Sequence, residues 1–467
     1  MHTSLQRSSC TLSKAQDELH LFPEEFIMNH PASTPTHIVI LGGGFGGLYA
    51  AMELEKRLAG RKDIEITLVN RENFFLFTPM LHEVAAGDLD LATIVNPVRK
   101  LLRRVHFFCG EAHSIDLRRR VVTVSHGAEE HGHTLPFDHL VIGLGSVPNF
   151  HGLPGLAENA LTMRSLGDAI DLRNRALACL EEADFECCAA QRERLLTFVI
   201  AGGGFAGIET AASLNDFLHE AVEFYANLKP EMIRVVVVHS GKVILPELRE
   251  KLGGYAQRKL RERNIDVRTE VRVVRYDNCK VHFSDGTAVH SNTLVWTAGT
   301  SPNPLLEQLP CVRERGRVLV NEFLQVPEWS GVWAQGDCAY VLDQRTGKPH
   351  PPTAQHALRQ GRTLARNIVA AIDGAKMRPF SFRTLGQLAS LGRCCGVANI
   401  LGVNFSGFIA WWLWRTIYLA KLPGLEKKVR VALQWTLDLF FSKDLVQFKT
   451  TKGIAISAQR EAAMVAA

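Results

Sequence analysis

The fold is decided by a glycine-rich turn that occurs twice in the chain. Residues 37–47 read HIVILGGGFGG, and residues 196–207 read LTFVIAGGGFAG. Each stretch places an apolar strand directly before a GxGxxG turn and a helix directly after it, from Leu48 and from Ile208. Glycine lets the backbone approach a pyrophosphate closely, at the positive N-terminal end of the helix. The pattern therefore predicts two dinucleotide-binding units of Rossmann type.

Apolar strands further along the chain extend both units. They are predicted at residues 64–69 and 139–142 in the first unit, and at 234–238 and 293–296 in the second. A last strand is predicted at 331–334, and a helix that begins at Pro-Pro-Thr runs from there to an Asp-Gly stop. This order predicts that the second unit is inserted into the first, as a distant internal duplication.

The positive charge of the chain is concentrated near its C-terminus. The net charge is +5, yet residues 393–452 alone hold nine Lys/Arg and three Asp/Glu. Four of the seven tryptophans fall in the same region, at positions 411, 412, 414 and 435. Basic charge together with tryptophan is typical of an anionic membrane surface. A nucleic-acid partner is disfavoured, because the charges alternate with large apolar residues.

A helix near residues 425–440 is predicted to lie in the plane of the membrane. One of its faces is apolar and the other is polar, with the members Val429, Leu433, Thr436, Leu437 and Phe440 against Lys427, Arg430, Gln434 and Asp438. Two alternatives stay open. The uncharged run 394–414 could span the membrane, although its Gly and Asn residues make it a poor spanning helix. Both helices could instead pack into the protein's own core or a homodimer interface.

The ten cysteines show no CxxC or CxxxxC spacing. We expect them to be reduced and mostly buried, which argues against a disulfide-reductase mechanism. No metal site is expected. The first 35 residues lack the basic and apolar regions of a secretory signal and are expected to be a flexible leader.

In each unit, the residue that ends the second strand is expected to face a ribose. In the first unit the residue is Asn70, whose amide can still bond a ribose hydroxyl. In the second it is His239, so no carboxylate repels a 2′-phosphate, and Lys242 could attract one. NADH is favoured, with NADPH left open.

Three further positions indicate a flavin and its reaction with a nicotinamide. Asp337 follows a strand and is expected to accept a hydrogen bond from a ribityl hydroxyl, with a plain turn residue as the alternative. The helix that begins at Ala354 and Gln355 could face the flavin pyrimidine edge, and Thr353 could cap that helix at the same time. Glu209 could hold the nicotinamide against the flavin, or simply complement the helix dipole.

With these residues in place, the chain closely resembles the type II NADH dehydrogenases, which are single-subunit NADH:quinone oxidoreductases. The resemblance runs from about residue 37 to residue 448. Its most specific stretches are FLFTPMLHEVAAG at 75–87, GFAGIETA at 204–211, AQGDCA at 334–339, PPTAQHA at 351–357 and FIAWWLWR at 408–415.

The resemblance implies a non-covalent FAD, NADH on the opposite flavin face, and a membrane quinone, menaquinone or ubiquinone, that enters beside Ala354 and Gln355. Glu209 and Gln355 are the expected catalytic residues. In this family no proton is pumped and no iron–sulfur centre is used. The residues expected to contact the two cofactors are Gly42, Gly44, Phe45, Gly46, Gly47, Asn70, Arg71, Thr78, Pro79, Ala112, Gly145, Gly202, Gly204, Gly207, Glu209, His239, Gly299, Asp337, Ala354 and Gln355.

The predicted fold is α/β, with two Rossmann-like dinucleotide-binding domains, one inserted in the other, and a C-terminal helical membrane-association segment. The expected boundaries are a leader at 1–35, an FAD-binding domain at 36–160 and 306–385, an NAD(P)H-binding domain at 161–305, and a C-terminal region at 386–467. The protein is expected at the cytoplasmic face of the cell membrane, as a peripheral protein.

Two other functions remain open at this point. A sulfide:quinone oxidoreductase would share the double fold and the tail, but would need cysteines beside the flavin, for which Cys338, Cys394 and Cys395 are the candidates. An NADH-sensing flavoprotein with weak turnover would share both nucleotide sites.

Overall fold

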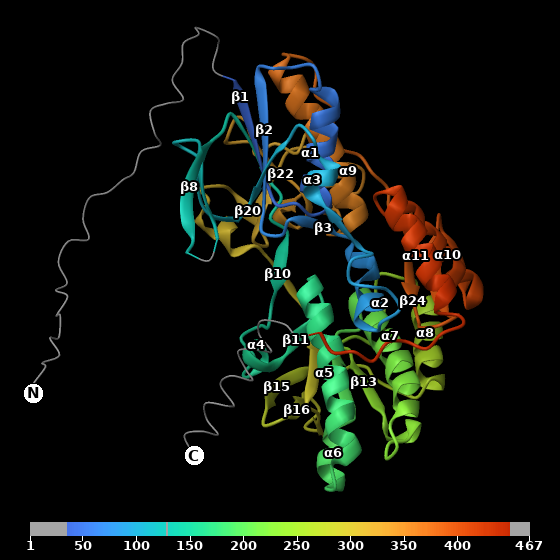
Figure 1. Ribbon diagram of the computed structural model, residues 1–467. Helices are drawn as coiled ribbons and strands as arrows, with labels where there is room; N and C mark the ends of the chain where they lie inside the picture. Colours follow the sequence, from blue (N-terminus) through green and yellow to red (C-terminus); the bar gives the residue numbers. More distant parts are fainter. Residues whose placement is uncertain (1–34, 128, 449–467) are drawn as a thin grey trace, which may run out of the picture.

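The computed structural model describes residues 35–127 and 129–448, and Figure 1 shows their arrangement. Two α/β units lie one above the other, and the last two helices lie along one side (Figure 1). The leader expected at 1–35 falls, except for its last residue, outside the described residues.

The first unit is built on a parallel five-stranded sheet with the order β22-β9-β1-β2-β5. Its strands are β1 (Thr36–Leu41), β2 (Ile64–Asn70), β5 (His106–Cys109), β9 (His139–Ile142) and β22 (Val332–Ala334). The helices α1 (Phe45–Arg57) and α9 (Ala354–Ile372) pack against each other over this sheet (Figure 1). Because β22 comes from beyond the second unit, the chain returns to the first sheet to complete it.

The second unit repeats this plan in the order β11-β18-β12-β13-β14, also parallel. Its strands are β11 (Leu161–Thr162), β12 (Thr197–Ala201), β13 (Arg234–Val238), β14 (Ile265–Arg268) and β18 (Thr293–Trp296), and its helices are α5 (Leu166–Phe185), α7 (Phe205–Ala221) and α8 (Glu250–Glu262). All five residues of β12 are buried, as expected for a central strand covered on both faces.

Smaller sheets surround and join the two units. Each unit carries an antiparallel meander, β6 (Glu111–Asp116), β7 (Val121–His126) and β8 (His131–Pro136) in the first, and β15 (Val273–Asp277), β16 (Lys280–Phe283) and β17 (Ala288–His290) in the second. The strand β10 (Ser146–Pro148) pairs antiparallel with β19 (Thr300–Pro302) and links the units.

The short elements complete the connections. They are β3 (Phe74–Leu76), β4 (Val95–Pro97), β20 (Arg313–Glu314), β21 (Arg317–Leu319), β23 (Ala339–Tyr340), α2 (Leu81–Ala85), α3 (Val98–Leu101), α4 (Leu156–Asn159), α6 (Ala189–Leu195), and the 3-10 turns η2 (Thr78–Met80), η3 (Val222–Phe224), η4 (Pro230–Met232), η5 (Pro304–Gln308) and η6 (Gly336–Cys338). Of these, α2 matters most below, because it packs between α5 and α7.

The C-terminal part is an antiparallel sheet followed by two helices. The strands are β24 (Gly386–Ser390), β25 (Gly396–Ile400) and β26 (Val403–Ser406), and the helices are α10 (Phe408–Lys421) and α11 (Leu425–Leu437). The uncharged run 394–414 therefore forms two strands and the start of α10, so it is not one spanning helix. None of the helices in the described ranges is both long and apolar enough to cross a membrane.

The sequence pattern predicted that the tryptophans of this part face outward, but most of them do not. Only Trp412 is exposed, at 54%, whereas Trp411, Trp414 and Trp435 are buried. The apolar face predicted for α11 is exposed, since Val429, Leu433 and Leu437 each expose more than half of their surface. The two helices thus present apolar side chains to the solvent while their buried indoles pack inward.

The cysteines also differ from expectation. Of the nine that the structure describes, all are free thiols, and only Cys179, Cys338 and Cys395 are buried. Cys109, Cys187, Cys188 and Cys394 are exposed because they lie at turns and element ends. The prediction of mostly buried thiols was therefore wrong.

Candidate functional site

The first glycine turn leaves open space over the N-terminus of α1. Gly42 has a positive φ of +97°, and a Cβ there would lie 2.3 Å from the Gly143 carbonyl oxygen. A Cβ on Gly47 would lie 1.8 Å from the Gly42 carbonyl oxygen, so both positions require glycine. Gly44, the N-cap of α1, has nothing within 4 Å of an added Cβ. This opening, at the positive end of a helix, fits a dinucleotide pyrophosphate.

The second glycine turn repeats this geometry. Gly202 has a φ of +123°, and a Cβ on Gly207 would lie 1.9 Å from the Gly202 carbonyl oxygen. Gly204, the N-cap of α7, again has nothing within 4 Å of an added Cβ. The structure therefore holds two openings of the same kind, one per sheet.

The residues that end the second strands, Asn70 and His239, contact the glycine turns. Asn70 Oδ1 accepts a hydrogen bond of 2.7 Å from the Gly43 amide, and its Nδ2 donates one of 2.7 Å to the Glu72 carbonyl. His239 packs in the same way against Gly203, where a Cβ would lie 2.6 Å from the ring. Burial lowers the pKa of His239. Next to Asn70, Arg71 is exposed and forms an ion pair with Glu111 at 3.5 Å.

Asp337 and the start of α9 lie at the end of the first sheet. Asp337 accepts a hydrogen bond of 2.5 Å from the Ser146 hydroxyl, just beyond Gly145. Thr353 does not cap α9 with its side chain, and its hydroxyl instead bonds His356 Nδ1 at 2.7 Å. The capping role left open for Thr353 is therefore wrong.

Gln335 was not singled out from the sequence, although it sits directly before Gly336. It is 1% exposed, and neither polar atom of its amide has a partner among the described residues. A Cβ added to Gly46 would lie 3.0 Å from this amide. An orphaned amide next to the first glycine turn fits a ligand with hydrogen-bonding groups there.

The remaining predicted contacts are distributed around the first sheet and the inter-unit link. Thr78 and Pro79 begin η2, and the adjacent Phe77 packs against Phe45 at 5.8 Å and against Tyr418 of α10 at 6.1 Å. The half-buried Ala112 lies on β6, opposite Val124. Gly299 precedes β19, and its carbonyl accepts a hydrogen bond of 3.1 Å from the Asn149 amide.

Gln355 connects the start of α9 to the C-terminal sheet. Its Nε2 donates a hydrogen bond of 3.1 Å to the carbonyl of Gly386, the first residue of β24. The last residue of the same strand, Ser390, donates its amide at 3.1 Å to Glu209 Oε1. One five-residue strand therefore joins the two residues expected to be catalytic.

Glu209 is a buried carboxyl at the boundary between α7 and the C-terminal part. It is 7% exposed and also accepts a 2.9 Å hydrogen bond from the indole of Trp414. Burial raises its pKa to about 8. It is the fifth residue of α7 and not part of the first turn, which has no acidic residue, so the simple helix-dipole role does not apply.

Two residues of α2 belong to this buried group, and sequence reasoning gave them no role. His82 lies with its Nε2 atom 3.9 Å from Glu209 Oε1 and with its Nδ1 atom 2.9 Å from the Ser213 hydroxyl. Glu83 accepts a hydrogen bond of 3.0 Å from the indole of Trp435. The only signal in the sequence was two titratable residues inside the mostly apolar stretch at 75–87.

Comparison with known proteins agrees with this geometry. Residues 36–361 match the family model of the pyridine nucleotide-disulphide oxidoreductases, and residues 385–444 match the NDH2 C-terminal domain. A probable NADH dehydrogenase of Dictyostelium discoideum is 33% identical over 419 residues, covering 88% of this chain and 91% of the relative. The type II NADH:quinone oxidoreductase Ndh of Mycobacterium tuberculosis is 33% identical over 424 residues, covering 87% and 88%.

Solved structures show the same fold. NDH2 from Plasmodium falciparum in complex with NADH matches with a TM-score of 0.82 at 18% identity, over 88% of this chain and 99% of that one. The sulfide:quinone oxidoreductase of Aquifex aeolicus matches with a TM-score of 0.64 at 20% identity, over 87% and 95%. The chain belongs to the pyridine nucleotide-disulphide oxidoreductases and, among them, to the type II NADH:quinone oxidoreductases.

Proposed function

We propose that the protein is an FAD-dependent NADH:quinone oxidoreductase, which passes two electrons from NADH through a flavin to a membrane quinone without pumping protons. The observation that carries this proposal is the pair of open glycine turns at Gly44 and Gly204, in a chain that aligns over nearly its full length with type II NADH:quinone oxidoreductases. FAD supplies the two-electron carrier between nicotinamide and quinone.

The first unit is the proposed FAD site. The amides at the start of α1 would hold the pyrophosphate, and Asn70 would keep the turn in shape while its remaining hydrogen-bonding capacity faces the ribose. Asp337, fixed by Ser146, would accept from the ribityl chain. The N-terminus of α9, at Ala354, would place positive helix potential against the flavin pyrimidine edge.

The second unit is the proposed nicotinamide site, with its pyrophosphate over Gly204 at the start of α7. His239 would lie below the ribose and would be neutral at pH 7, since burial lowers its pKa. Glu209 and Gln355 are the proposed catalytic residues, on the nicotinamide and the quinone side respectively. Support comes from β24, which hydrogen-bonds to both.

We also propose that α10 and α11 hold the protein at the cytoplasmic face of an anionic membrane, as a peripheral protein. Phe408, Ile409 and Trp412 of α10 are each more than half exposed, as are three leucine and valine positions of α11. A buried apolar side chain contributes roughly 1.5–3 kcal/mol, so such a face binds lipid readily. The same face could bury itself in a homodimer, which is the competing outcome.

Steady-state NADH oxidation by the purified protein, with a menaquinone or ubiquinone analogue in lipid vesicles, tests the proposed function. Fast quinone-dependent turnover supports the enzyme, whereas a long-lived reduced complex with little turnover would indicate a sensor. Sulfide-dependent quinone reduction would indicate the sulfide enzyme. Against that rival, burial raises the pKa of the Cys338 thiol to about 12, which is the opposite of what a sulfur nucleophile needs.

A further inference from the structure

The helix α9 begins after a threonine that does not cap it. Thr353 has the extended backbone of an N-cap residue, with a φ of −129° and a ψ of 152°, yet its side chain accepts no hydrogen bond from the helix. A capping threonine would accept from the amide of Gln355 or of His356. The Thr353 hydroxyl instead bonds Nδ1 of His356 at 2.7 Å. The first turn of α9 therefore keeps an amide donor that a threonine usually satisfies.

The imidazole of His356 is held in this orientation by aromatic neighbours. It is 2% exposed, and its ring lies 5.0 Å from the ring of Phe382 and 5.2 Å from that of His350. His350 packs in turn against Phe380 at 5.1 Å. Because a buried ring cannot turn away from such close neighbours without displacing them, Nδ1 stays against the Thr353 hydroxyl.

The His356 ring acts through this hydrogen bond and not as a charge. Burial lowers its pKa to about 4, and the nearby His350 and Arg359 lower it further in the same direction. The ring is therefore neutral at pH 7. Its effect on α9 depends on what it does to the Thr353 hydroxyl.

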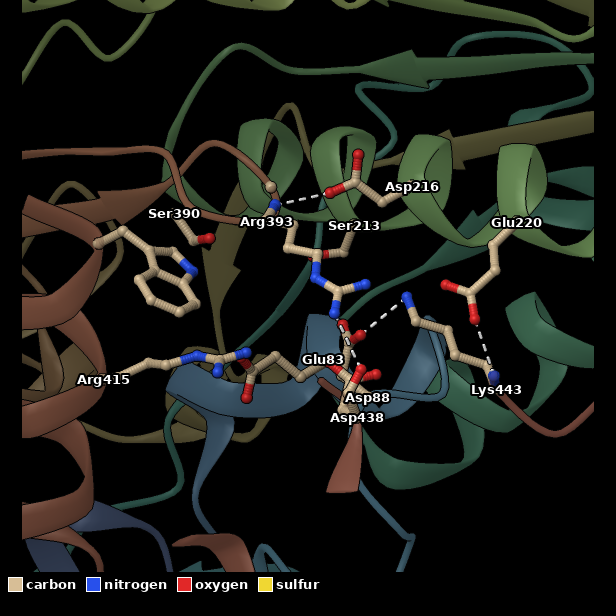
Figure 2. Close-up of a pocket in the computed structure, with 12 residues that line it drawn as sticks. Glu83, Asp88, Ser213, Asp216, Glu220, Ser390, Arg393, Arg415, Asp438 and Lys443 are labelled. Carbon is tan, nitrogen blue, oxygen red and sulfur yellow. Dashed lines mark hydrogen bonds and ion pairs between the residues drawn. The ribbon is translucent and has the colours of Figure 1, made fainter. Parts of the chain in front are cut away.

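Acidic groups of the neighbouring elements are engaged away from α9. They line a cavity of about 30 Å³ among α2, α7, α10 and the chain after α11, and Figure 2 shows its side chains. There Asp88 pairs with Lys443 at 2.7 Å, and Asp216 accepts from the Arg393 amide at 2.7 Å (Figure 2). No residue of α9 is among those that line this cavity. These two carboxylates are thus bound to partners of their own and not to the amides at the start of α9.

Two contacts indicate that the start of α9 belongs to the proposed flavin site. A Cβ added to Gly336 would lie 3.6 Å from that of Ala357, so the turn that carries Asp337 packs against the first turn of α9. The buried amide of Gln335, which has no partner among the described residues, would lie 3.1 Å from a Cβ added to Gly361 of the same helix. An orphaned amide there fits a bound ligand. The inference below rests on the proposed function, in which this ligand is FAD.

We propose that His356 is a positioning residue for the flavin, because by engaging the Thr353 hydroxyl it leaves the first-turn amides of α9 free for the flavin pyrimidine edge. Reduction of a flavin adds negative charge at that edge, and a free amide at the positive end of a helix stabilises this charge. If the hydroxyl capped the helix, one of these amides would be satisfied internally. The arrangement forgoes a helix cap and makes the flavin easier to reduce.

The test measures the midpoint potential of the bound FAD in the holoenzyme by spectroelectrochemical titration. In His356→Leu the Thr353 hydroxyl loses its partner and can cap α9. The ratio of reduced to oxidised flavin at a fixed potential should then fall about tenfold, as expected for one lost hydrogen bond to a charged group. For a two-electron couple this is about 30 mV. His356→Asn, which offers the hydroxyl an amide in place of Nδ1, should keep the wild-type potential.

Thr353→Val is the matched control, since it removes the hydroxyl with little change in shape. Alone it should keep the wild-type potential, and combined with His356→Leu it should restore that potential, because no hydroxyl remains to cap α9. If His356 only supported the packing, the double variant would stay as low as His356→Leu. A wild-type potential in His356→Leu, or an equal fall in Thr353→Val, would overturn the proposal.

A second readout does not depend on the flavin. In a crystal structure of His356→Leu, the Thr353 hydroxyl should lie within hydrogen-bond distance of the amide of residue 355 or 356. A hydroxyl that stays away from both amides would also overturn the proposal. If the purified protein bound no FAD, the proposed function would fail, whereas this structure would still decide whether His356 keeps Thr353 from capping α9.

Discussion

The indole N–H of Trp414 donates a 2.9 Å hydrogen bond to the carboxyl group of Glu209, which lies 205 positions earlier in the chain. Trp435 does the same for Glu83 at 3.0 Å. Each of the last two helices, α10 and α11, therefore donates a hydrogen bond from one indole to a buried carboxyl group. The helices that face outward with apolar side chains therefore contact, on their inner side, the buried carboxyls of Glu209 and Glu83.

Trp414→Phe should destabilise the FAD-loaded protein by about 1–3 kcal/mol, because it keeps the ring but leaves a buried carboxyl without one donor. Equilibrium unfolding in denaturant measures the difference. Trp412→Phe is the control on the same helix, since Trp412 is 54% exposed, and it should change the free energy of unfolding little. Equal losses in the two variants would contradict the role given to the Trp414 hydrogen bond.

The contribution of Glu209 to the stability of the protein should fall as the pH rises from about 4.5 to about 8. The pKa of Glu209 is raised from 4.5 to about 8 by burial, so in this window the folded state holds a proton that the unfolded state has lost. Such a group lowers the free energy of unfolding by up to about 1.4 kcal/mol per pH unit. Glu209→Gln should flatten this slope in unfolding curves recorded across the window. A variant as pH-dependent as wild type would show that Glu209 titrates normally.

Leu433→Glu should weaken binding to anionic lipid vesicles about tenfold or more, since it replaces a 58% exposed apolar side chain with a charge. Vesicle co-sedimentation measures the partition. The control is Phe185→Glu, which changes an apolar residue that is 84% exposed at the far end of α5. If Leu433→Glu bound lipid normally but shifted a dimer to monomer in sedimentation, the face would be a subunit interface.

His239→Glu should lower the ratio of NADPH to NADH efficiency about tenfold, because a carboxylate below the ribose repels a 2′-phosphate and accepts from a 2′-hydroxyl. The ratio of kcat/KM for the two donors measures the change. An unaltered ratio would mean that this residue does not face the ribose.

The two strand-turn-helix units could be predicted from the sequence because their signals are local. The first helix was expected to begin at Leu48 and runs from Phe45 to Arg57, and the strand expected at 234–238 has those bounds. The glycine turns, Asn70 and His239 followed from the same short pattern. Their roles towards FAD and NADH stay predictions.

The buried group around Glu209 could not be predicted, because its members come from distant segments. His82 meets Ser213 across 131 positions, and no spacing in the sequence indicates that pair. The strands β25 and β26 were missed because a short apolar run with Gly and Asn lacks a clear period of either kind. The tryptophans were placed at the lipid from composition, which cannot distinguish an indole that donates inward from one that faces out.

The inward hydrogen bonds of α10 and α11 have a consequence for anyone who wants a water-soluble form of this protein. Deleting the chain from about Arg393 onward would remove the indole donors of Glu209 and Glu83 and expose these buried carboxyls. The helices α10 and α11, which we propose to face the lipid, are therefore no detachable anchor. A soluble variant would have to keep the full length of the chain. Only exposed apolar residues, such as Val429, Leu433 and Leu437, would be replaced by polar ones.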